Sequence, residues 1–290
     1  MPTRYYTVAR HTFAVTLPEG ETGIALPSYE PFAVAAGAEK PQFTLTVDDT
    51  FYPTEKGDTI GEFDCGAADF GVYRLTDGTY QILISPPGGK YCGLLQANGD
   101  FSQATIATRG EDSMRTFAVN NALMLVYAFA TATMETMLIH ASVIKNHGHG
   151  YLFLGKSGTG KSTHTRLWRE RFPDCFMVND DKPIIRLEDG QFYACGTPWS
   201  GKHDLDTNVS VPLKGIVLLA RGEENRIERV KPETLIGLLF NQIYRPSDQA
   251  AYLKTIDLVS EMLSSCPVYK LYCNMDIEAA EVAERAFRGE

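Results

Sequence analysis

A glycine-rich segment near the middle of the chain has the residue types and the spacing of a phosphate-binding site. Residues 155–163 have the sequence GKSGTGKST, which contains the full pattern G-x-x-x-x-G-K-[ST]. Its glycines allow backbone torsions that a side chain forbids, so successive N–H groups can turn toward an anion. Its second lysine supplies a positive charge for the β- and γ-phosphates, and the hydroxyl that follows can bind Mg²⁺. The residues predicted to bind the nucleotide are Gly155, Ser157, Gly158, Thr159, Gly160, Lys161, Ser162 and Thr163.

Two neighbouring carboxylates follow this segment at a short distance. Asp180 and Asp181 lie 19 and 20 residues after Lys161 and close the apolar run 175–178. Phosphoryl transfer needs carboxylates that hold Mg²⁺ and that accept or orient the proton of the attacking group. Adjacent side chains of an extended backbone point in different directions, so one carboxylate can face a metal ion and the other an acceptor. The same Asn-Asp-Asp sequence is also typical of a turn that closes a strand, but the phosphate-binding pattern upstream favours the catalytic interpretation.

The composition is that of a globular protein with reduced thiols. Of the 290 residues, 44% are hydrophobic and 22% are charged, and the six cysteines have no C-x-x-C spacing. The first residues contain no apolar stretch of signal-peptide length. We therefore expect one or two domains and a cytoplasmic location.

The net charge of −9 arises mainly in the first part of the chain. Residues 1–112 contain 7 lysines and arginines and 15 aspartates and glutamates, whereas the remainder contains 20 and 21. The chain thus lacks the excess of basic residues that a general nucleic-acid-binding protein needs, and we expect no nucleic-acid partner. Residues 116–134 carry no charge but include polar Asn and Thr side chains, which predict a buried core helix rather than a membrane span.

The elements that must position the phosphate-binding segment and the aspartates fall into two predicted domains. Residues 1–112 consist of short apolar runs between turns such as 76–79, which predicts a mostly antiparallel, β-rich N-terminal lobe with acceptor recognition as one expected role. Residues 113–290 form the predicted catalytic domain, in which a long helix over 113–138 precedes a strand over 138–144. Strands and helices then mix to the end of the chain, so the predicted fold class is α/β in a mixed α+β form.

Three features of the second domain together resemble the C-terminal catalytic domain of HPr serine kinase/phosphorylase. They are His140 within the run 138–144, the sequence GKSGTGKST, and the sequence NDD at 179–181. The phosphoenolpyruvate carboxykinases share this nucleotide-binding arrangement, and the resemblance covers about residues 138–275. HPr kinases typically carry an acidic residue where this chain has Thr163, and the carboxykinases are considerably longer chains. An HPr-kinase-like protein that acts on a different acceptor fits the sequence better than HPr kinase itself.

The resemblance implies a role for each candidate residue. Lys161 and Ser162 would bind phosphate and Mg²⁺. Asp180 would be the general base toward an acceptor hydroxyl and Asp181 a metal ligand, with the order of the two aspartates left open. His140 either neutralises a phosphate or transfers a proton, or it is a core histidine satisfied within its strand.

The sequence therefore predicts an ATP- and Mg²⁺-dependent kinase that transfers a γ-phosphoryl group to a hydroxyl of a protein, peptide or small molecule. Two other functions stay open: a nucleotide-dependent lyase related to the carboxykinases, and a nucleotide-sensing regulatory module with little turnover. The sequence does not separate ATP from GTP or pyrophosphate, predicts no membrane partner, and is compatible with a homo-oligomer. Further candidates for an acceptor pocket or for charge stabilisation are Lys202 and His203 in the segment 197–203, Arg221 and Arg245.

Overall fold

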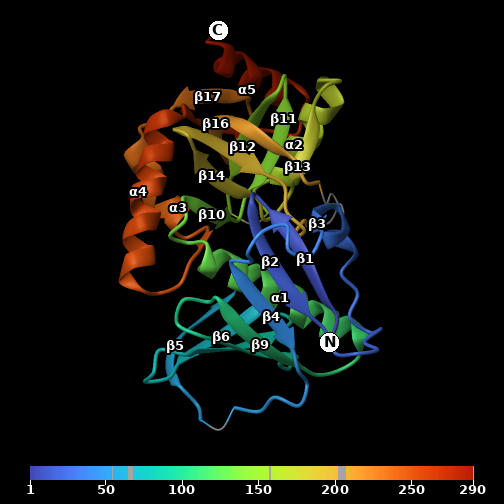
Figure 1. Cartoon of the computed structure of the whole chain (residues 1–290). Helices are drawn as coiled ribbons and strands as arrows, with labels where there is room; N and C mark the ends of the chain where they lie inside the picture. Colours follow the sequence, from blue (N-terminus) through green and yellow to red (C-terminus); the bar gives the residue numbers. More distant parts are fainter. Residues whose placement is uncertain (54, 65–67, 157, 202–206, 290) are drawn as a thin grey trace. The chain divides into compact units, whose positions relative to one another are not determined.

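The structure is a computed structural model, which describes residues 1–290 except 54, 65–67, 157, 202–206 and 290. The described residues form two compact units, Met1–Thr131 and Ala132–Glu290 (Figure 1). Each unit contains a mixed β-sheet with helices packed against it. The mixed α/β fold class predicted from the sequence is therefore confirmed.

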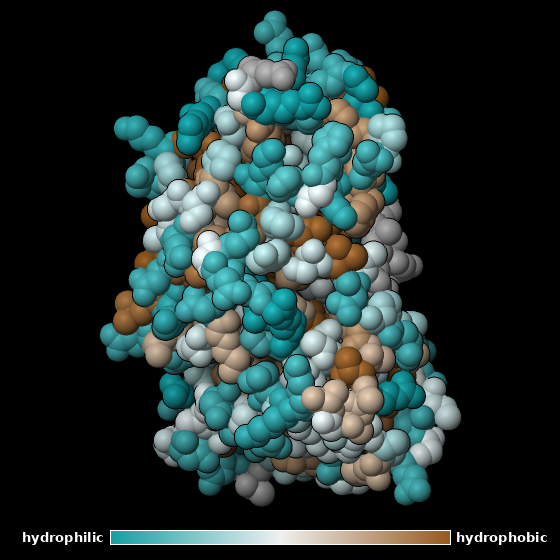
Figure 2. All heavy atoms as spheres, turned by 45° about the horizontal axis from the view of Figure 1, so that its top comes forward, coloured by the Kyte–Doolittle hydropathy of each residue, from teal (hydrophilic) through white to brown (hydrophobic). Residues whose placement is uncertain are grey.

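Most side chains on the face drawn in Figure 2 are hydrophilic, with hydrophobic ones scattered among them. Such scattered apolar groups are normal for a protein surface. Within the described part of the Ala132–Glu290 unit, the most exposed large hydrophobic side chain is that of Met275, with 76% of its surface accessible.

The sheet of the Met1–Thr131 unit is mostly antiparallel, as its short apolar runs predict. Its strand order is β3-β1-β2-β4-β9-β8-β7-β6-β5, and the parallel pairs are β2–β4 and β4–β9. The predicted turn over 76–79 joins β6 to β7, where Leu75 N–H donates to Thr79 O over 2.8 Å and Gly78 has a φ of 89°. The strands are β1 (Thr3–Val8), β2 (His11–Thr16), β3 (Ala33–Val34), β4 (Phe43–Val47), β5 (Asp58–Asp64), β6 (Asp69–Arg74), β7 (Tyr80–Ser85), β8 (Gly93–Ala97) and β9 (Gln103–Thr108), and a short 3₁₀ helix, η1 (Pro27–Phe32), precedes β3.

Helix α1 (Asp112–Ala130) packs against this sheet, on β4, β7, β8 and β9. Its last two-thirds are almost entirely buried, which confirms the predicted core helix. The helix ends at Ala130 and not at residue 138, because residues 136–139 pair as a strand of the other unit. The division between the units therefore falls after the helix, at residue 131, and not before it. No helix among the described residues is long and apolar enough to span a membrane.

The sheet of the Ala132–Glu290 unit has the order β13-β11-β12-β16-β15-β14-β10-β18, with β19 beside β16 and β17 beside β19. The strand predicted over 138–144 is in fact two strands, because the chain passes from β10 to β11 at His140 and Ala141. The strands are β10 (Thr136–Ile139), β11 (Ser142–Asn146), β12 (His149–Leu154), β13 (Phe176–Asn179), β14 (Ile184–Glu188), β15 (Gln191–Cys195), β16 (Ser210–Arg221), β17 (Arg226–Arg229), β18 (Ile243–Tyr244) and β19 (Val268–Cys273). The helices are α2 (Lys161–Arg171), η2 (Pro232–Leu235), α3 (Ile236–Phe240), α4 (Gln249–Ser265) and α5 (Glu278–Arg288).

Strand β12 is buried on both faces because helices cover both sides of the sheet. Leu152 and Leu154 belong to a cluster that includes the apolar face of α4. Tyr151 and Phe153 point the other way, into a cluster with α2 and α5. A strand covered on both faces is expected to be apolar throughout, as this one is. The rigid strand then leads directly into the phosphate-binding segment.

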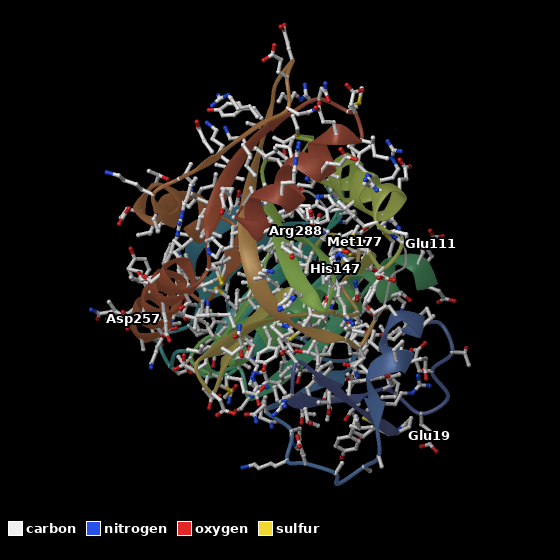
Figure 3. All side chains as sticks on the ribbon, turned by 90° about the horizontal axis from the view of Figure 1, so that it is seen from above. Glu19, Glu111, His147, Met177, Asp257 and Arg288 are labelled. Atoms are coloured by element: carbon white, nitrogen blue, oxygen red, sulfur yellow. The ribbon has the colours of Figure 1, made fainter. Side chains whose placement is uncertain are left out.

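The helices on the two faces lie well apart when the molecule is seen from above. Figure 3 labels Asp257 on α4 and Arg288 on α5, and these residues lie on opposite sides of the sheet. Helix α5 approaches the sheet closely at Gly215, where an added Cβ would lie 2.0 Å from the ring of Phe287. Glycine at this position of β16 is therefore needed for the observed packing.

Candidate active site

Four strands of the Ala132–Glu290 unit end at the same edge of its sheet. Strand β11 is antiparallel to both β12 and β13, so β12 and β13 run parallel to each other, and β16 and β19 run parallel to β12. Neighbouring strands are about 4.8 Å apart, so the ends of β12 and β13 lie about 10 Å from each other. The phosphate-binding loop (residues 155–160) follows β12, the two aspartates follow β13, and His140 lies between β10 and β11, two residues before β11 begins. Ligands of α/β proteins typically bind at such an edge.

The phosphate-binding loop has the backbone that an anion site requires. Gly158 and Gly160 have φ values of 77° and 104°, in the left-handed region that favours glycine. Gly160 is the N-cap of α2, and no side chain of the described residues caps this helix. The N–H groups of its first turn are thus left for an anion. Ser157 lies outside the described residues.

Lys161 is held at the base of the loop. Its side chain is buried, and its Nζ atom donates to Gly155 O over 2.9 Å. Burial lowers the pKa of Lys161, the positive charge of Lys182 lowers it further, and the negative charge of Asp181 opposes both. A buried ammonium group gains more than an exposed one from a phosphate, because less water screens the interaction. Ser162, the next residue, has an exposed side chain.

Asn179 organises the turn that carries the two aspartates. Its Oδ1 atom accepts from the N–H groups of Asp181 and Lys182, over 2.9 Å and 2.7 Å. Its Nδ2 atom donates to Thr197 Oγ1 over 3.0 Å. The Asn-Asp-Asp sequence therefore forms a turn that the side chain of Asn179 stabilises. The carboxylates of the two aspartates take no part in these hydrogen bonds.

The carboxylate of Asp180 contacts the loop that follows β15. Its Oδ1 atom accepts from the N–H of Gly201 over 2.5 Å. Its backbone oxygen accepts from Ser142 Oγ over 2.9 Å, which ties the turn to the start of β11. The other carboxylate oxygen of Asp180 has no partner among the described residues. Asp180 as a whole is a buried residue, with 8% of its surface accessible.

The carboxylate of Asp181 lies among basic side chains. Its Oδ2 atom is 2.8 Å from Nζ of Lys182, and its Oδ1 atom is 3.4 Å from Nε2 of His140. Its charge also acts on Lys161 and raises the pKa of that lysine. The structure therefore brings together His140, Lys161 and Asp181, three residues that the sequence placed in the site.

His140 is uncharged at neutral pH. Burial lowers its pKa to about 4, and the positive charges of Lys182 and Lys161 lower it as well, while Asp181 opposes the shift. The imidazole faces Asp181 rather than the apolar core, so it is not a core histidine. A neutral imidazole can pass on a proton or donate a hydrogen bond, but it adds no positive charge for a phosphate.

Lys182 is a site residue that the sequence analysis missed. It is 3% exposed, its ammonium group contacts Asp181, and it lies 5.6 Å from the centre of the Tyr244 ring. Its signal in the sequence is its position directly after the acidic pair, in NDDK. A lysine is rarely buried without a charged partner, and Asp181 is that partner here.

Of the other basic residues that the sequence suggested for the site, one reaches the phosphate-binding loop. Arg221, at the end of β16, reaches the phosphate-binding loop, where its Nη2 atom donates to Gly158 O over 2.8 Å. Arg245 instead stacks on aromatic rings, 4.2 Å from the centre of Phe240 and 5.3 Å from that of Tyr252. Lys202 and His203 lie outside the described residues.

The described residues contain no cluster of three or more His, Cys, Asp or Glu side chains suited to a metal ion. Mg²⁺ in phosphoryl-transfer sites does not need such a cluster, because phosphate oxygens and water supply most of its ligands. The hydroxyl of Ser162 and the carboxylate of Asp181 are the oxygen donors that would hold it. Since Lys182 and His140 already contact that carboxylate, a metal ion has to compete with them.

Fold and site together define a mixed α/β protein with a glycine-rich loop and a pair of acidic residues at one edge of its sheet. The family model described as SynChlorMet cassette protein ScmC matches residues 104–288, well over half of the chain, and the chain belongs to this family. The matching family is thus ScmC and not that of an HPr kinase. A comparison with curated proteins gives no match.

A solved structure, that of the Hpr(Ser) kinase/phosphatase from Coxiella burnetii, is similar to part of this chain. The similarity covers 52% of this chain and 97% of that chain, with 13% sequence identity and a TM-score of 0.31. These values are too low to support an argument about activity. Conclusions about function therefore depend on the geometry of the site itself.

Proposed function

We propose that the Ala132–Glu290 unit is an ATP- and Mg²⁺-dependent phosphotransferase that transfers the γ-phosphoryl group to a hydroxyl acceptor. The observation that carries the proposal is the meeting of two features at one sheet edge. The loop lysine, Lys161, and the carboxylate of Asp181 are close enough for the charge of one to shift the pKa of the other. Phosphoryl transfer requires this combination of a polyphosphate cradle and adjacent carboxylates.

The loop would bind the polyphosphate. The uncapped N–H groups at the start of α2 and the ammonium group of Lys161 would neutralise its charge. Ser162 and Asp181 would hold Mg²⁺, which supplies positive charge to the phosphate oxygens when it is bound. Lys182 would keep the carboxylate of Asp181 in place and add a further positive charge beside the transferred group.

Asp180 is the better of the two aspartates for the role of base. One of its carboxylate oxygens is fixed by Gly201 N–H, and the other is without a partner among the described residues. That oxygen can accept the proton of an acceptor hydroxyl. Asp181, in contrast, is engaged by Lys182 and His140 through both oxygens, which suits a charge-holding role.

Transfer from labelled ATP tests the proposal. Calorimetry measures ATP binding, and transfer is followed on candidate acceptors and on the chain itself. Lys161→Ala should abolish ATP binding, because it removes the ammonium group from the polyphosphate. Asp180→Asn should bind ATP as the parent does but should lose transfer, since an amide cannot accept the proton. Equal binding and transfer by the parent and both variants would contradict the proposal.

One observation supports a second candidate, a nucleotide-sensing module with little turnover. Lys182 contacts one oxygen of the carboxylate that would hold the metal ion, and this contact would oppose binding of the metal. Tight ATP binding by the parent, without transfer to any acceptor tested, would favour this function over the kinase.

A further inference from the structure

A pocket of about 480 Å³ opens on the other side of the phosphate-binding loop from the aspartates. Its walls come from residues 158–160 of the loop, from Thr163 and His164 in the first turn of α2, from the end of β16, and from residues 273–275 after β19. Pockets of this size hold small organic ligands. The phosphotransferase mechanism described above does not use it.

We infer that this pocket binds the ribose and base of the phosphate donor, so that the donor is a nucleoside triphosphate and not pyrophosphate. The inference rests on the proposed function, because it takes the loop to be the polyphosphate site. The inference adds the position of the donor's ribose and base and names the residues that contact them.

The order of the strands sets the direction of the donor along the sheet edge. Strands β11 and β13 lie on one side of β12 and carry His140, Asp180 and Asp181 at this edge. Strands β16 and β19 lie on the other side, and their ends form the pocket. The γ-phosphoryl group has to face the carboxylates for transfer. The far end of a polyphosphate on the loop then points toward β16 and β19, where the pocket begins.

The side chains of the pocket suit a flat, partly apolar group. Met275 lines the pocket and is 76% exposed, so its side chain is accessible to a ligand there. Its flexible thioether packs well against aromatic rings. Arg221 is held at the rim by its hydrogen bond to Gly158 O, and a guanidinium plane can stack on a base.

His164 is a buried residue in the wall of the pocket. It is 2% exposed, and its Nε2 atom accepts from Trp168 Nε1 over 3.0 Å. Nδ1 must therefore carry the proton of the neutral ring, and this atom has no partner among the described residues. Because this nitrogen is itself buried, His164 contributes to the shape of the pocket wall and not a hydrogen bond to the ligand.

Binding of two probes separates the inference from the proposed function. Calorimetry on the full chain compares ATP with inorganic tripolyphosphate, which has the phosphates but no nucleoside. Met275→Ala should weaken ATP binding about fivefold, because an apolar contact of the base is lost, and should leave tripolyphosphate binding within about twofold. Met134→Ala is the matched control, since Met134 is exposed but does not line the pocket, and it should change neither affinity. Lys161→Ala should abolish binding of both probes.

The outcomes differ for the two claims. Suppose that Lys161→Ala abolishes binding of both probes, while Met275→Ala changes the affinity for ATP no more than that for tripolyphosphate. The pocket then does not bind the nucleoside, but the loop still binds the polyphosphate. If the parent binds neither probe, or if Lys161→Ala has no effect, the proposed function fails.

Photolabelling tests the position of the base without relying on a single side chain. The parent chain is irradiated with 8-azidoadenosine triphosphate, and labelled peptides are identified by mass spectrometry. Label is expected in residues 273–275 or 221–222, and excess ADP should prevent it. Label confined to 179–182 or 197–201 would overturn the inference, because the base would then lie on the side of the carboxylates.

Discussion

The Nζ atom of Lys182 lies 2.8 Å from Oδ2 of Asp181, and the other oxygen of that carboxylate lies 3.4 Å from Nε2 of His140. Lys161 also interacts with the charge of Asp181. One carboxylate is thus shared by three basic side chains. Groups that share a charge in this way titrate together, so a change at one of them shifts the protonation of the others.

Replacement of Lys182 should therefore be visible at His140. In Lys182→Met the positive charge that depresses the pKa of His140 is gone, so this pKa should rise above its present value of about 4. It should stay below the ordinary value of 6.5, because burial is the largest cause of the shift. NMR titration of the imidazole measures it. Lys254→Met, which changes an exposed lysine on α4, is the control and should leave the value where it is. A pKa that is unchanged or lower in Lys182→Met would contradict the shared-charge description.

The chain should lose stability as the pH falls below about 6.5. The pKa values of His140 and His164 are lowered from 6.5 to about 4 and about 3, in both cases mainly by burial. Between those values and 6.5 the unfolded chain binds a proton that the folded chain does not, so the free energy of unfolding decreases with decreasing pH. Each histidine contributes at most about 1.4 kcal/mol per pH unit.

His164→Phe isolates one of these contributions. Urea unfolding at pH 7 and pH 5, followed by the fluorescence of Trp168 and Trp199, reports on the Ala132–Glu290 unit, which contains both tryptophans. The variant should be less stable at pH 7, because Trp168 loses its hydrogen-bond acceptor. The difference in its stability between pH 7 and pH 5 should nevertheless be smaller than in the parent. An equal difference would mean that His164 takes up its proton as readily in the folded chain as in the unfolded one.

The local parts of the site were predictable from the sequence, because neighbouring residues determine them. The glycine-rich pattern predicts the loop between β12 and α2, and the Asn-Asp-Asp sequence predicts a turn with carboxylates at the end of β13. The short apolar runs of residues 1–112 likewise predict the antiparallel strands of the first unit. Which of the two aspartates is base and which binds metal stays a prediction.

Contacts between distant segments were not predictable in the same way. The hydrogen bond from Gly201 to Asp180 joins residues 21 positions apart and depends on how the loop after β15 folds back. The apolar run 138–144 has the composition of one strand, and only the pairing of its halves with different neighbours breaks it at His140. Helix α1 ends early for a similar reason, because residues 136–139 pair with the distant strands β14 and β18 instead of extending the helix.

Asn179→Ala should destabilise the Ala132–Glu290 unit by about 2–4 kcal/mol, since each buried hydrogen bond contributes about 1 kcal/mol and the freed N–H groups are left without partners. The asparagine is fully buried and fixes the N–H groups of Asp181 and Lys182. Asn146→Ala is the matched control, because Asn146 is equally buried but its side chain has no hydrogen-bond partner among the described residues, and this variant should cost less. Chemical denaturation measures both variants. Equal losses would show that the hydrogen bonds of Asn179 do not stabilise the turn.

Gly201→Ala should reduce phosphoryl transfer with little effect on ATP binding. A Cβ atom at Gly201 would lie 3.1 Å from both carboxylate oxygens of Asp180, which must move away from it. The phosphate-binding loop is on another strand end and should keep its affinity. Gly237→Ala is the matched control, because its added Cβ meets nothing within 4 Å. Calorimetry with ATP and transfer of labelled phosphate measure the two properties separately. We expect transfer to fall about threefold in Gly201→Ala, because the carboxylate of Asp180 has to shift by a few tenths of an ångström. Normal transfer by Gly201→Ala together with normal transfer by Asp180→Asn would exclude Asp180 as the base.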